Sequence, residues 1–500
     1  MLSRCNKLGY YSSQVVPLMA TLTTKFSSMF IIFICFFSGI HASEGTPAAT
    51  EINFHIFHLS SLLPASVCTD HTKGSNNRVS TMKVFHRHGL CFRRRGGRDK
   101  ATMAAMSTPS LSEVFSQDQY RVDSIQARLS PKPSTNKVDE AKVNLPAKPG
   151  GSFSTGNYVV MVSLGTPAKT LTLSFDTGSD LTWTQCQPCV QSCYKQVDPI
   201  FDPSGSSSYS NISCDSPQCS QLFSATGHVP GCLSGSTCVY AIQYVDKSIS
   251  VGYLSKDKLT LSSADVIPDF LFGCGQDNQG LFGATAGIIG LGRNPLSIVS
   301  QTAQKYGKYF SYCIPSISGS TGHLTLGKNG ASGNVKFTPI DLSKEASHYF
   351  IDIIAITVGG LELPISQSVF KTAGTIIDSG TVITRLPPEA YSSMRSTFQQ
   401  LMATYPRAPA FSIFDTCYDL SNFSTLTIPK VAFTFGGNVK VDLSPQGILI
   451  ATSSSTACLA FAANNAATDV GIFGNTQQTT LEVVYDVAGG NLGFGPGGCS

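Results

Sequence analysis

The sequence predicts an all-β protein built from two lobes of similar design. Only 13% of its residues are charged and 45 are glycine, a composition typical of a β-rich globular chain. Stretches such as NYVVMVSLGTP, residues 157–167, alternate apolar and polar residues and end in turn residues, which is the pattern of a half-buried strand. A strand that ends in Asp before a glycine turn occurs twice, about two hundred residues apart.

The order of these segments indicates an internal duplication. A strand, a glycine turn and a strand ending in Asp come first as NYVVMVSLGTP and KTLTLSFDTGS, and again as HYFIDIIAITVGG and TAGTIIDSGT. Each half then reaches a unit of two apolar residues and a glycine, within Gly287–Gly292 and Gly471–Asn475. A chain of 500 residues is long enough for a two-lobed molecule. We therefore expect two β lobes related by a pseudo-dyad, with a central cleft between them.

Charge divides the chain into a basic leader and an acidic body. Residues 1–149 carry 18 Lys and Arg against 9 Asp and Glu, a net of +9, whereas residues 150–500 carry 17 against 22, a net of −5. Such asymmetry suggests two parts with different fates. We expect a signal peptide at 1–42, a basic prosegment and linker at 43–155, a first lobe at 156–345 and a second lobe at 346–500.

The N-terminal leader contains an apolar run, Met29–Ala42, that is too short to span a bilayer comfortably and ends in small residues. It resembles a signal peptide, and a start at Met19 would give it an ordinary polar beginning. The first acidic residue is Glu44 and the early part is rich in Ser and Thr, so a plastid transit peptide is the alternative. A membrane anchor is a third, weaker interpretation. No other segment is long and apolar enough to span.

One helix is expected in the prosegment, in the stretch PSLSEVFSQDQYRVDSIQARLS. Ser112 could cap it, and its apolar stripe would consist of Val114, Phe115, Ile125 and Leu129. A linker rich in Pro, Gly and Lys follows. A helix before an exposed linker suits a prosegment with its cleavage site.

The basic stretch HRHGLCFRRRGGRDK, residues 86–100, has two interpretations. A nucleic-acid patch is one, but no aromatic or helical recognition pattern accompanies the charges. We favour a leader that contacts the acidic body at neutral pH and leaves on acidification, when carboxylates of the body become protonated. The cations expected to hold it are Arg93, Arg94, Arg95, Arg98 and Lys100.

Cysteines indicate an oxidising compartment. Twelve of the 16 lie in residues 150–500, and seven of these fall between Cys186 and Cys238. An even, clustered set behind a signal-like leader predicts disulfides. Zinc is the competing interpretation for CQPCVQSC, but no second Cys-x-x-Cys or paired His follows, and we expect no metal. Two sequons, at Asn211 and Asn422, fit glycosylation on the secretory route.

The two Asp turns predict a pair of catalytic carboxylates, Asp176 and Asp378. Two carboxylates that face each other share one proton, because both cannot easily ionise at close range. One then acts as a base on a water molecule while its protonated partner polarises a carbonyl group, without a cofactor. The structural alternative is Asp in ordinary turns. Glycines would let the backbone approach, and the hydroxyls of Ser179 and Thr381 would hydrogen-bond the carboxylates. The expected supporting residues are Thr177, Gly178, Ser179, Ser379, Gly380 and Thr381.

These motifs, with Trp183, resemble the pepsin-like aspartic proteases over about Gly156 to Ser500. The segments DTGSDLTWTQCQPC, SYSNISC, FGCGQDNQGLFG, GIIGLGR and FSYC are most similar to the plant nepenthesin-type group. The prosegment, with VFHRHG, is similar to the subgroup of the tobacco chloroplast nucleoid DNA-binding protease. The resemblance implies a monomeric aspartic endopeptidase made as a zymogen, active on protein or peptide substrates at acidic pH and blocked by pepstatin-type analogues. It also implies secretion to the apoplast, with vacuole and chloroplast as alternatives.

The resemblance further implies a hairpin flap that carries a Tyr. We expect Trp183 to hydrogen-bond this Tyr, and the alternative is that Trp183 is an ordinary core residue. Tyr244 is our first choice for that Tyr and Tyr240 the second, and the flap departs from the usual Tyr-Gly-Asp-Gly at Val245 and Lys247. Six disulfides are implied: Cys186–Cys189, Cys193–Cys274, Cys214–Cys238, Cys219–Cys232, Cys313–Cys499 and Cys417–Cys458.

Two other functions compete with proteolysis. Some pepsin-like plant proteins inhibit glycan-cleaving enzymes and lack an intact catalytic pair, whereas both Asp turns are intact here. Nucleic-acid binding through the basic leader is the other, and we expect none by the mature body. We assign no role to Arg293 or Arg385, and we expect no stable membrane span.

Overall fold

The computed structural model divides into two compact units, residues 1–49 and 50–500. All residues described below belong to the second unit. The described residues are 52–63, 67–69, 80–87, 89–95, 110–129, 158–243, 248–262, 265–280, 282–316, 319–328 and 334–499, with the side chains of 93–95 left aside. The predicted signal peptide and linker lie outside these ranges, as do Tyr244, Val245, Lys247, Arg98 and Lys100.

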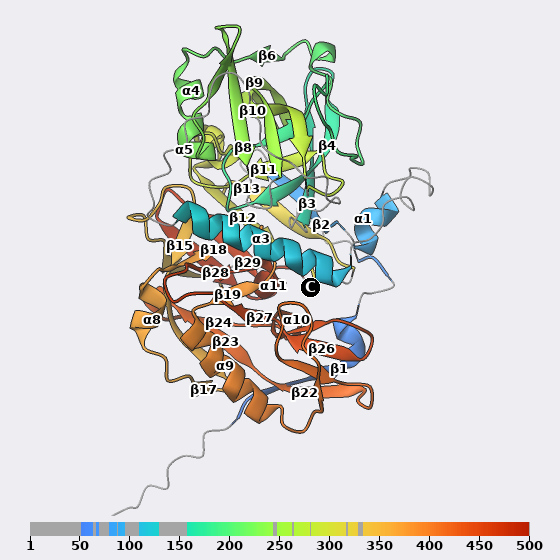
Figure 1. Cartoon of the computed structure of the whole chain (residues 1–500), viewed down its shortest axis with the longest axis vertical. Helices are drawn as coiled ribbons and strands as arrows, with labels where there is room; N and C mark the ends of the chain where they lie inside the picture. The colour runs from blue at the N-terminus through green and yellow to red at the C-terminus, as the bar shows by residue number, and fades with distance from the viewer. Residues whose placement is uncertain are drawn as a thin grey trace, which may run out of the picture. The chain divides into compact units, whose positions relative to one another are not determined.

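Strands dominate the structure, as the sequence predicts (Figure 1). The largest sheet has 15 strands. In spatial order they are β14 (Lys336–Pro339), β30 (Asn491–Gly495), β29 (Glu482–Asp486), β12 (Tyr309–Cys313), β13 (Gly322–Leu326), β2 (Ser80–His86), β3 (Tyr158–Leu164), β4 (Lys169–Asp176), β11 (Gly287–Gly290), β5 (Trp183–Gln185), β10 (Asp265–Gln279), β9 (Ile249–Ser262), β8 (Thr237–Gln243) and β7 (Gly231–Leu233), with β6 (Ser210–Asn211) beside β9.

Four smaller sheets contain the remaining strands, mostly from the second half of the chain. Five strands run in the order β15 (Tyr349–Ile351), β18 (Thr375–Ile377), β28 (Gly471–Phe473), β19 (Thr384–Leu386) and β27 (Phe461–Ala463). Two four-stranded sheets follow: β17 (Leu361–Glu362), β16 (Ile353–Val358), β23 (Val431–Phe435), β24 (Val439–Asp442); and β20 (Arg407–Ala408), β21 (Cys417–Asp419), β26 (Thr456–Leu459), β25 (Leu449–Ala451). Finally, β1 (Phe54–His58) pairs with β22 (Thr425–Pro429).

Among the described residues, two helices are long and the others are short. The long ones are α3 (Leu111–Leu129) and α9 (Pro388–Leu401). The short ones are α1 (Leu90–Arg95), α4 (Pro217–Ser220), α5 (Leu222–Thr226), α6 (Ile298–Gln301), α7 (Ala303–Tyr306), α8 (Gln367–Lys371), α10 (Pro445–Ile448) and α11 (Asn475–Gln478), with 3-10 turns η1 (Leu59–Leu62), η2 (Pro203–Gly205) and η3 (Gly436–Asn438). None of the helices in the described ranges has the length and apolar character needed to cross a membrane.

The two halves share one pattern of strand pairing. In the first half β3 is antiparallel to β4, β4 is parallel to β11, β11 is antiparallel to β5, and β5 is parallel to β10. The second half repeats this order and these directions in β15, β18, β28, β19 and β27. The structure therefore confirms the predicted bilobal all-β fold and its internal duplication.

Part of the predicted prosegment is built into the body. Strand β2 pairs antiparallel with both β13 and β3, so it is an interior strand of the large sheet. Val84 and Phe85 on this strand are buried. A disulfide between Cys68 and Cys91, which the sequence reasoning did not include, links the segments on either side of β2. Removal of β2 would leave two neighbouring strands with unpaired backbone groups.

Helix α3 begins at a capping box. The Ser110 amide donates to the Glu113 carboxylate at 2.6 Å, and the Glu113 amide donates to Ser110 Oγ at 3.3 Å. The cap is thus Ser110, and our assignment of Ser112 was wrong. The predicted apolar stripe is confirmed: Val114, Phe115 and Ile125 are buried and Leu129 is partly buried.

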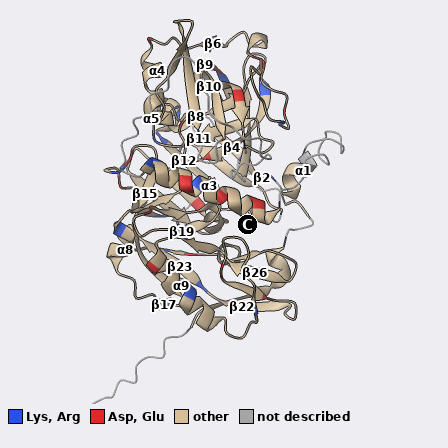
Figure 2. Cartoon of the chain, in the orientation of Figure 1, with Lys and Arg blue, Asp and Glu red and all other residues tan. Residues whose placement is uncertain are grey.

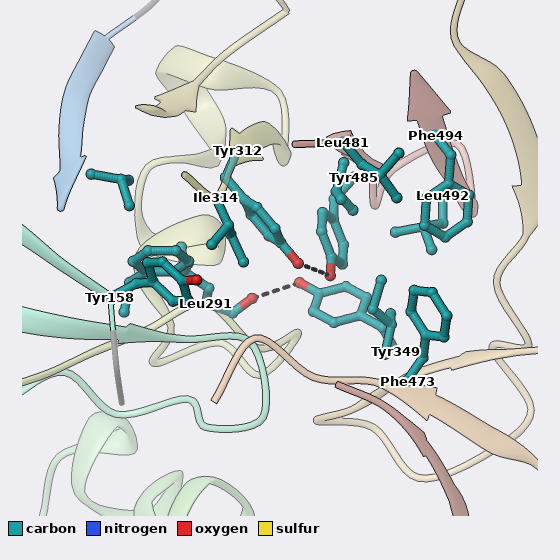
Figure 3. Packing of buried hydrophobic residues seen from close by; sticks show 14 of the residues in the cluster. Tyr158, Leu291, Tyr312, Ile314, Tyr349, Phe473, Leu481, Tyr485, Leu492 and Phe494 are labelled. Atoms are coloured by element: carbon teal, nitrogen blue, oxygen red, sulfur yellow. Dashed lines mark hydrogen bonds between the residues drawn. The ribbon is translucent and has the colours of Figure 1, made fainter. Parts of the chain in front are cut away.

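A cluster of buried aromatic side chains joins strands of the two halves (Figure 3). Tyr312 and Tyr485 share a hydrogen bond of 3.1 Å, and Tyr349 donates to the Leu291 carbonyl at 2.7 Å. Tyr312 also donates to Gln478. The rings of Tyr349 and Tyr485 also meet edge-on, with centroids 4.6 Å apart, and such pairs contribute about 0.5–1.5 kcal/mol each beyond their burial. Strands from the two halves are therefore fixed against each other, and Gln478 in turn donates to the Asp378 carbonyl at 3.3 Å.

The disulfides correct four of the six implied pairings. Cys313–Cys499 and Cys417–Cys458 are confirmed. The other four were wrong: the observed bonds are Cys186–Cys274, Cys189–Cys193, Cys214–Cys232 and Cys219–Cys238.

Candidate active site

Asp176 and Asp378 occupy equivalent places in the two halves. Asp176 is the last residue of β4, and its carbonyl accepts the Leu291 amide at 2.8 Å, just beyond β11. Asp378 follows β18, and its amide donates to the Phe473 carbonyl, at the end of β28, at 3.1 Å. In both halves the apolar-apolar-Gly strand lies parallel to the strand that leads into the Asp. The duplication therefore places both carboxylates by the same local construction.

The residues that follow each Asp tie the two turns together. The Thr177 amide donates to Ser379 Oγ at 3.1 Å, and the Ser379 amide donates to Thr177 Oγ1 at 2.9 Å. All four groups are buried. Because each turn satisfies the backbone of the other, the distance between the two Asp residues is fixed by a reciprocal pair of hydrogen bonds.

The glycines are required by space. Gly178 N–H donates to Asp176 Oδ1 at 2.9 Å, and Gly380 N–H donates to Asp378 Oδ1 at 3.0 Å. A Cβ added at Gly178 would lie 2.7 Å from the Asp378 carboxylate, and one at Gly380 would lie 2.5 Å from the Asp176 carboxylate. These contacts are closer than carbon and oxygen tolerate, so each turn leaves room for the opposite carboxylate only without a side chain.

The two predicted hydroxyls behave differently. Thr381 Oγ1 donates to Asp378 Oδ2 at 2.5 Å, as expected. Ser179 Oγ is buried without a hydrogen-bond partner among the described residues, and so is Asp176 Oδ2. The predicted bond from Ser179 to a carboxylate is therefore absent here, and the first carboxylate keeps an unused acceptor.

A side chain that our sequence reasoning missed lies between the two carboxylates. Arg121, on α3, donates through Nη2 to Asp176 Oδ1 at 2.6 Å and to Asp378 Oδ1 at 2.9 Å. Its Nε donates to Asp378 Oδ2 at 2.9 Å and to Thr381 Oγ1 at 3.3 Å. One guanidinium nitrogen thus contacts both carboxylates, which shows how close together they lie.

The charge of Arg121 alters the titration of the site. Burial alone would raise the pKa of Asp378, but the Arg121 charge and the hydrogen bonds from Arg121, Thr381 and Gly380 lower it below the usual Asp value. Burial works against the charged form of Arg121, yet the two carboxylates outweigh burial and raise the pKa of the guanidinium. One of the two carboxylate charges is therefore balanced by a residue from outside both lobes.

Further contacts hold α3 along its length. Gln126 Nε2 donates to the Val470 carbonyl at 2.8 Å and its Oε1 accepts the Val470 amide at 2.8 Å. Arg128 donates to Ser347 Oγ at 3.0 Å. Asp118 pairs with Arg385 at 2.9 Å. Figure 2 colours acidic residues red and basic residues blue, and helix α3 carries both along its course. The predicted cations of residues 93–100 are not among these contacts, because their side chains lie outside the description.

The predicted flap residues are only partly described. Trp183 is fully buried, with its ring edge-on to Phe282 at 4.8 Å, and its Nε1 has no hydrogen-bond partner among the described residues. Tyr240 shares a hydrogen bond of 2.7 Å with Ser250. A bond from Trp183 to Tyr244 stays a prediction. Both sequon residues, Asn211 and Asn422, are exposed.

Comparison with known proteins assigns the fold and the family. Two family models, described as xylanase inhibitor N-terminal and xylanase inhibitor C-terminal, match residues 158–328 and 348–496. Solved structures of edgp and of basic 7S globulin from soybean share the fold, with TM-scores of 0.56 and 0.54, at 19% and 20% identity. Each covers 68% of this chain and 91% of the other. With its paired Asp turns, and with relatives named as aspartyl proteases at 52% and 46% identity, the chain belongs to the pepsin-like aspartic proteases of plants.

Similar proteins of known family narrow the classification of the chain. An aspartyl protease family protein of Arabidopsis thaliana is 52% identical over 94% of this chain and 98% of its own length. The aspartyl protease AED1 of the same plant is 46% identical over 96% and 100%. Aspartic proteinase nepenthesin-2 of Nepenthes gracilis is 38% identical over 69% and 78%. The predicted nepenthesin-type membership is confirmed, and the chain is an aspartic-type endopeptidase by family.

Proposed function

We propose that Asp176 and Asp378 are the catalytic pair of this endopeptidase and that the chain is made as a zymogen blocked by Arg121. The observation that carries this proposal is the single guanidinium nitrogen of Arg121, within 2.6 Å of one carboxylate and 2.9 Å of the other. A substrate carbonyl needs access to the same place.

The chemistry follows from the removal of Arg121. Without the cation, two buried carboxylates at this separation cannot both stay ionised, so the pair keeps one proton. The ionised carboxylate takes a proton from a water molecule as that water attacks the scissile carbonyl carbon. The protonated carboxylate donates its proton to the carbonyl oxygen. The tetrahedral intermediate then collapses with protonation of the leaving amine, and the pair returns to its starting state.

The turns hold the ionised form in place. Gly178 and Gly380 each donate an N–H to the carboxylate of their own turn, and Thr381 adds a hydroxyl to Asp378. Asp378 therefore has one more hydrogen-bond donor within the body than Asp176 has. Donors to the charged form favour it. We assign the resting negative charge to Asp378, which has the additional donor.

Acidification should open the zymogen through the same pair. The pKa of Asp378 is lowered while Arg121 is bound, so the closed form binds protons at this residue less tightly than the open form. Its contribution to the closed state is full at neutral pH and is lost as the pH falls toward that lowered value. Burial raises the pKa of Asp118, which acts in the opposite direction, so the Asp378 contribution must exceed it.

The described contacts point to α3 as the inhibitory element. Val114 and Phe115 pack with Ile383, Phe414 and Ile450, while Val122 and Ile125 pack with a second apolar group of the body. Strand β2, by contrast, belongs to the large sheet. Activation therefore requires only that the α3 segment leave.

The decisive test of function is turnover by the processed protein at acidic pH. We expect hydrolysis of a fluorogenic peptide that a pepstatin-type analogue blocks and a metal chelator does not. Activity that resists the analogue but is lost with the chelator would overturn the proposal.

A non-catalytic binding protein is the second candidate, favoured by the description of the matching family models as xylanase inhibitor. The intact Asp pair argues against it. Inhibition of a xylanase by a processed protein that hydrolyses no peptide would establish it instead.

We also propose the secretory route and a monomer. Seven disulfides among the described residues and two exposed sequons support secretion. N-terminal sequencing of the purified protein separates a signal peptide from a transit peptide, and a glycosidase shift in mass tests Asn211 and Asn422.

A further inference from the structure

A buried cation beside the carboxylate pair is unexplained by the chemistry above. Arg385, the middle residue of β19, is 1% exposed. Its Nη2 pairs with Asp118 at 2.9 Å, and its Nε is buried without a hydrogen-bond partner among the described residues. Arginine is rarely buried unless it is paired. Our sequence reasoning assigned this residue no role.

The acidic partner sits in a complete binding site. Asp118 is fully buried, and besides Arg385 its carboxylate accepts the Val382 amide at 2.5 Å and the Ile383 amide at 3.1 Å. Three donors from one short segment of the body thus surround one carboxylate. Two backbone donors together with a guanidinium form the type of site that recognises a carboxylate.

The anion in this site comes entirely from the leader. Asp118 lies on α3, three residues before Arg121 and therefore about 4.5 Å away along the helix axis. Asp123, the other acidic residue that influences Arg385, is also on α3. Within the described residues, no carboxylate of the body pairs with Arg385. When α3 leaves, the guanidinium and two amides lose their anion together.

We propose that Arg385, with the amides of Val382 and Ile383, is a substrate subsite that selects an Asp or Glu side chain. The acidic residue lies a few positions to one side of the cleaved bond, because the subsite is only one helical turn from Arg121. In the zymogen Asp118 occupies the subsite in place of the substrate. This inference rests on the proposed function, since it concerns the specificity of the same protease.

The surroundings favour strong discrimination. Val382 and Ile383 belong to an apolar cluster with Phe414 and Ile450 that α3 covers in the precursor and that a bound substrate would cover in the processed enzyme. In such surroundings a guanidinium without an anion is costly, and a neutral amide cannot replace the charge. A peptide with Gln instead of Glu would leave Arg385 unpaired. The site should therefore reject it more strongly than a solvent-exposed arginine would.

The experiment compares paired peptides with the processed enzyme. Each pair carries Glu or Gln at one position, scanned over the residues on both sides of the cleaved bond, and kcat/KM is measured at pH about 5.5, above the usual Glu pKa. At one position we expect a Glu-to-Gln ratio of about 10–100, the size of a hydrogen bond to a charged group. The ratio should fall toward one at pH about 3, where the substrate carboxyl is protonated.

Two variants of Arg385 test whether this residue causes the Glu-to-Gln ratio. Arg385→Gln should bring it to about one, and Arg385→Lys should restore part of it, since a positive charge remains. Arg293→Gln is the matched control, because Arg293 donates to the His348 carbonyl at 2.9 Å and to the Glu345 carbonyl rather than to a carboxylate. The control should keep the wild-type ratio. If Arg385→Gln does not fold, the peptide scan of the wild-type enzyme still decides.

Two results would overturn the subsite. One is the absence of any position with acidic preference in the wild-type enzyme, which would make the Arg385–Asp118 pair a latch for the leader only. The other is an acidic preference that persists in Arg385→Gln. Failure of the proposed function looks different: Asp176→Asn would then still cleave both peptides. A non-cleavable reduced-amide peptide, with Glu or Gln, measures the same preference as a ratio of Kd values without turnover.

Discussion

Arg121→Met in the full-length chain should convert a latent precursor into one that is open before any cleavage. The change removes the guanidinium and keeps a long apolar stem. In the structure that guanidinium makes four hydrogen bonds, two of them to Asp378 and one to Asp176. Its side chain is 14% exposed and that of Asp378 is fully buried, so solvent screens these contacts little. The loss of these hydrogen bonds should therefore strongly destabilise the closed precursor.

The magnitude follows from the burial of these charges. Breaking a buried ion pair by removing one partner costs about 3–5 kcal/mol. The carboxylate pair left without Arg121 can take up a proton, which offsets part of this cost. We therefore use the lower half of the range, about 3–4 kcal/mol. That weakens the closed state by about 10²–10³-fold, since about 1.4 kcal/mol corresponds to a factor of ten.

The assay measures the initial rate on a fluorogenic peptide at pH about 5, with the mass of the protein followed in the same samples. Uncleaved Arg121→Met should be at least tenfold more active than the uncleaved wild-type chain. Arg128→Met is the control: Arg128 also helps to hold α3, through Ser347, Asp180 and Glu345, but does not contact the Asp pair, so this variant should stay much closer to wild-type latency than Arg121→Met. The reasoning is refuted if uncleaved Arg121→Met is as latent as the wild type, or if the intact wild-type precursor is already fully active.

Four further outcomes are expected. Phe115→Ala removes a ring packed on the second lobe and should also loosen the precursor, because Phe-to-Ala changes in cores cost about 3–5 kcal/mol; exposed Tyr120→Ala, its control, should leave latency unchanged. Gly380→Ala should abolish turnover in the processed enzyme with an unchanged circular dichroism spectrum, since its Cβ would meet the opposite carboxylate. Val84→Asp places a charge in the interior strand β2 and should lower the melting temperature or abolish folding, whereas no change would show that β2 is dispensable. A pH jump from neutral to acid should trigger self-cleavage of the full-length chain as Asp378 takes up a proton; cleavage equally fast at neutral pH would contradict this sign.

The features that depend on local sequence pattern could be predicted correctly. Asp176 and Asp378 each follow an alternating strand and precede a glycine turn, and the order of strands repeats, so the pair and the two lobes could be predicted without coordinates. The helix of the prosegment could be predicted too, since Val114, Phe115 and Ile125 have helical spacing.

What failed depends on contacts between distant segments. Arg121 lies on the predicted helix, but its target is 257 residues away at Asp378, and a single Arg on an amphipathic helix has no local signal. The sequence prediction assigned the contact between leader and body to the dense positive charges of residues 86–100 instead. A usable signal was present in the spacing of Asp118 and Arg121, an acid and a base one turn apart on a helix of a leader.

The disulfide errors have a similar origin. Seven cysteines fall between Cys186 and Cys238, so several partners lie within reach of each. Cys232 and Cys238 stand opposite each other in β7 and β8, yet each bonds a cysteine outside that hairpin. The disulfide partners depend on which loops lie next to each other in the folded chain, and the spacing of cysteines in the sequence does not reveal this.

The measurement that tests the central claim most directly is the turnover of Asp176→Asn and Asp378→Asn in the processed enzyme, beside the wild type. Asn preserves the size of the side chain and removes the shared proton, so each variant should lose peptide hydrolysis by about a thousandfold or more while retaining its melting temperature and disulfides. If either correctly folded variant hydrolysed the peptide at a rate near that of the wild type, Asp176 and Asp378 would not be the catalytic pair.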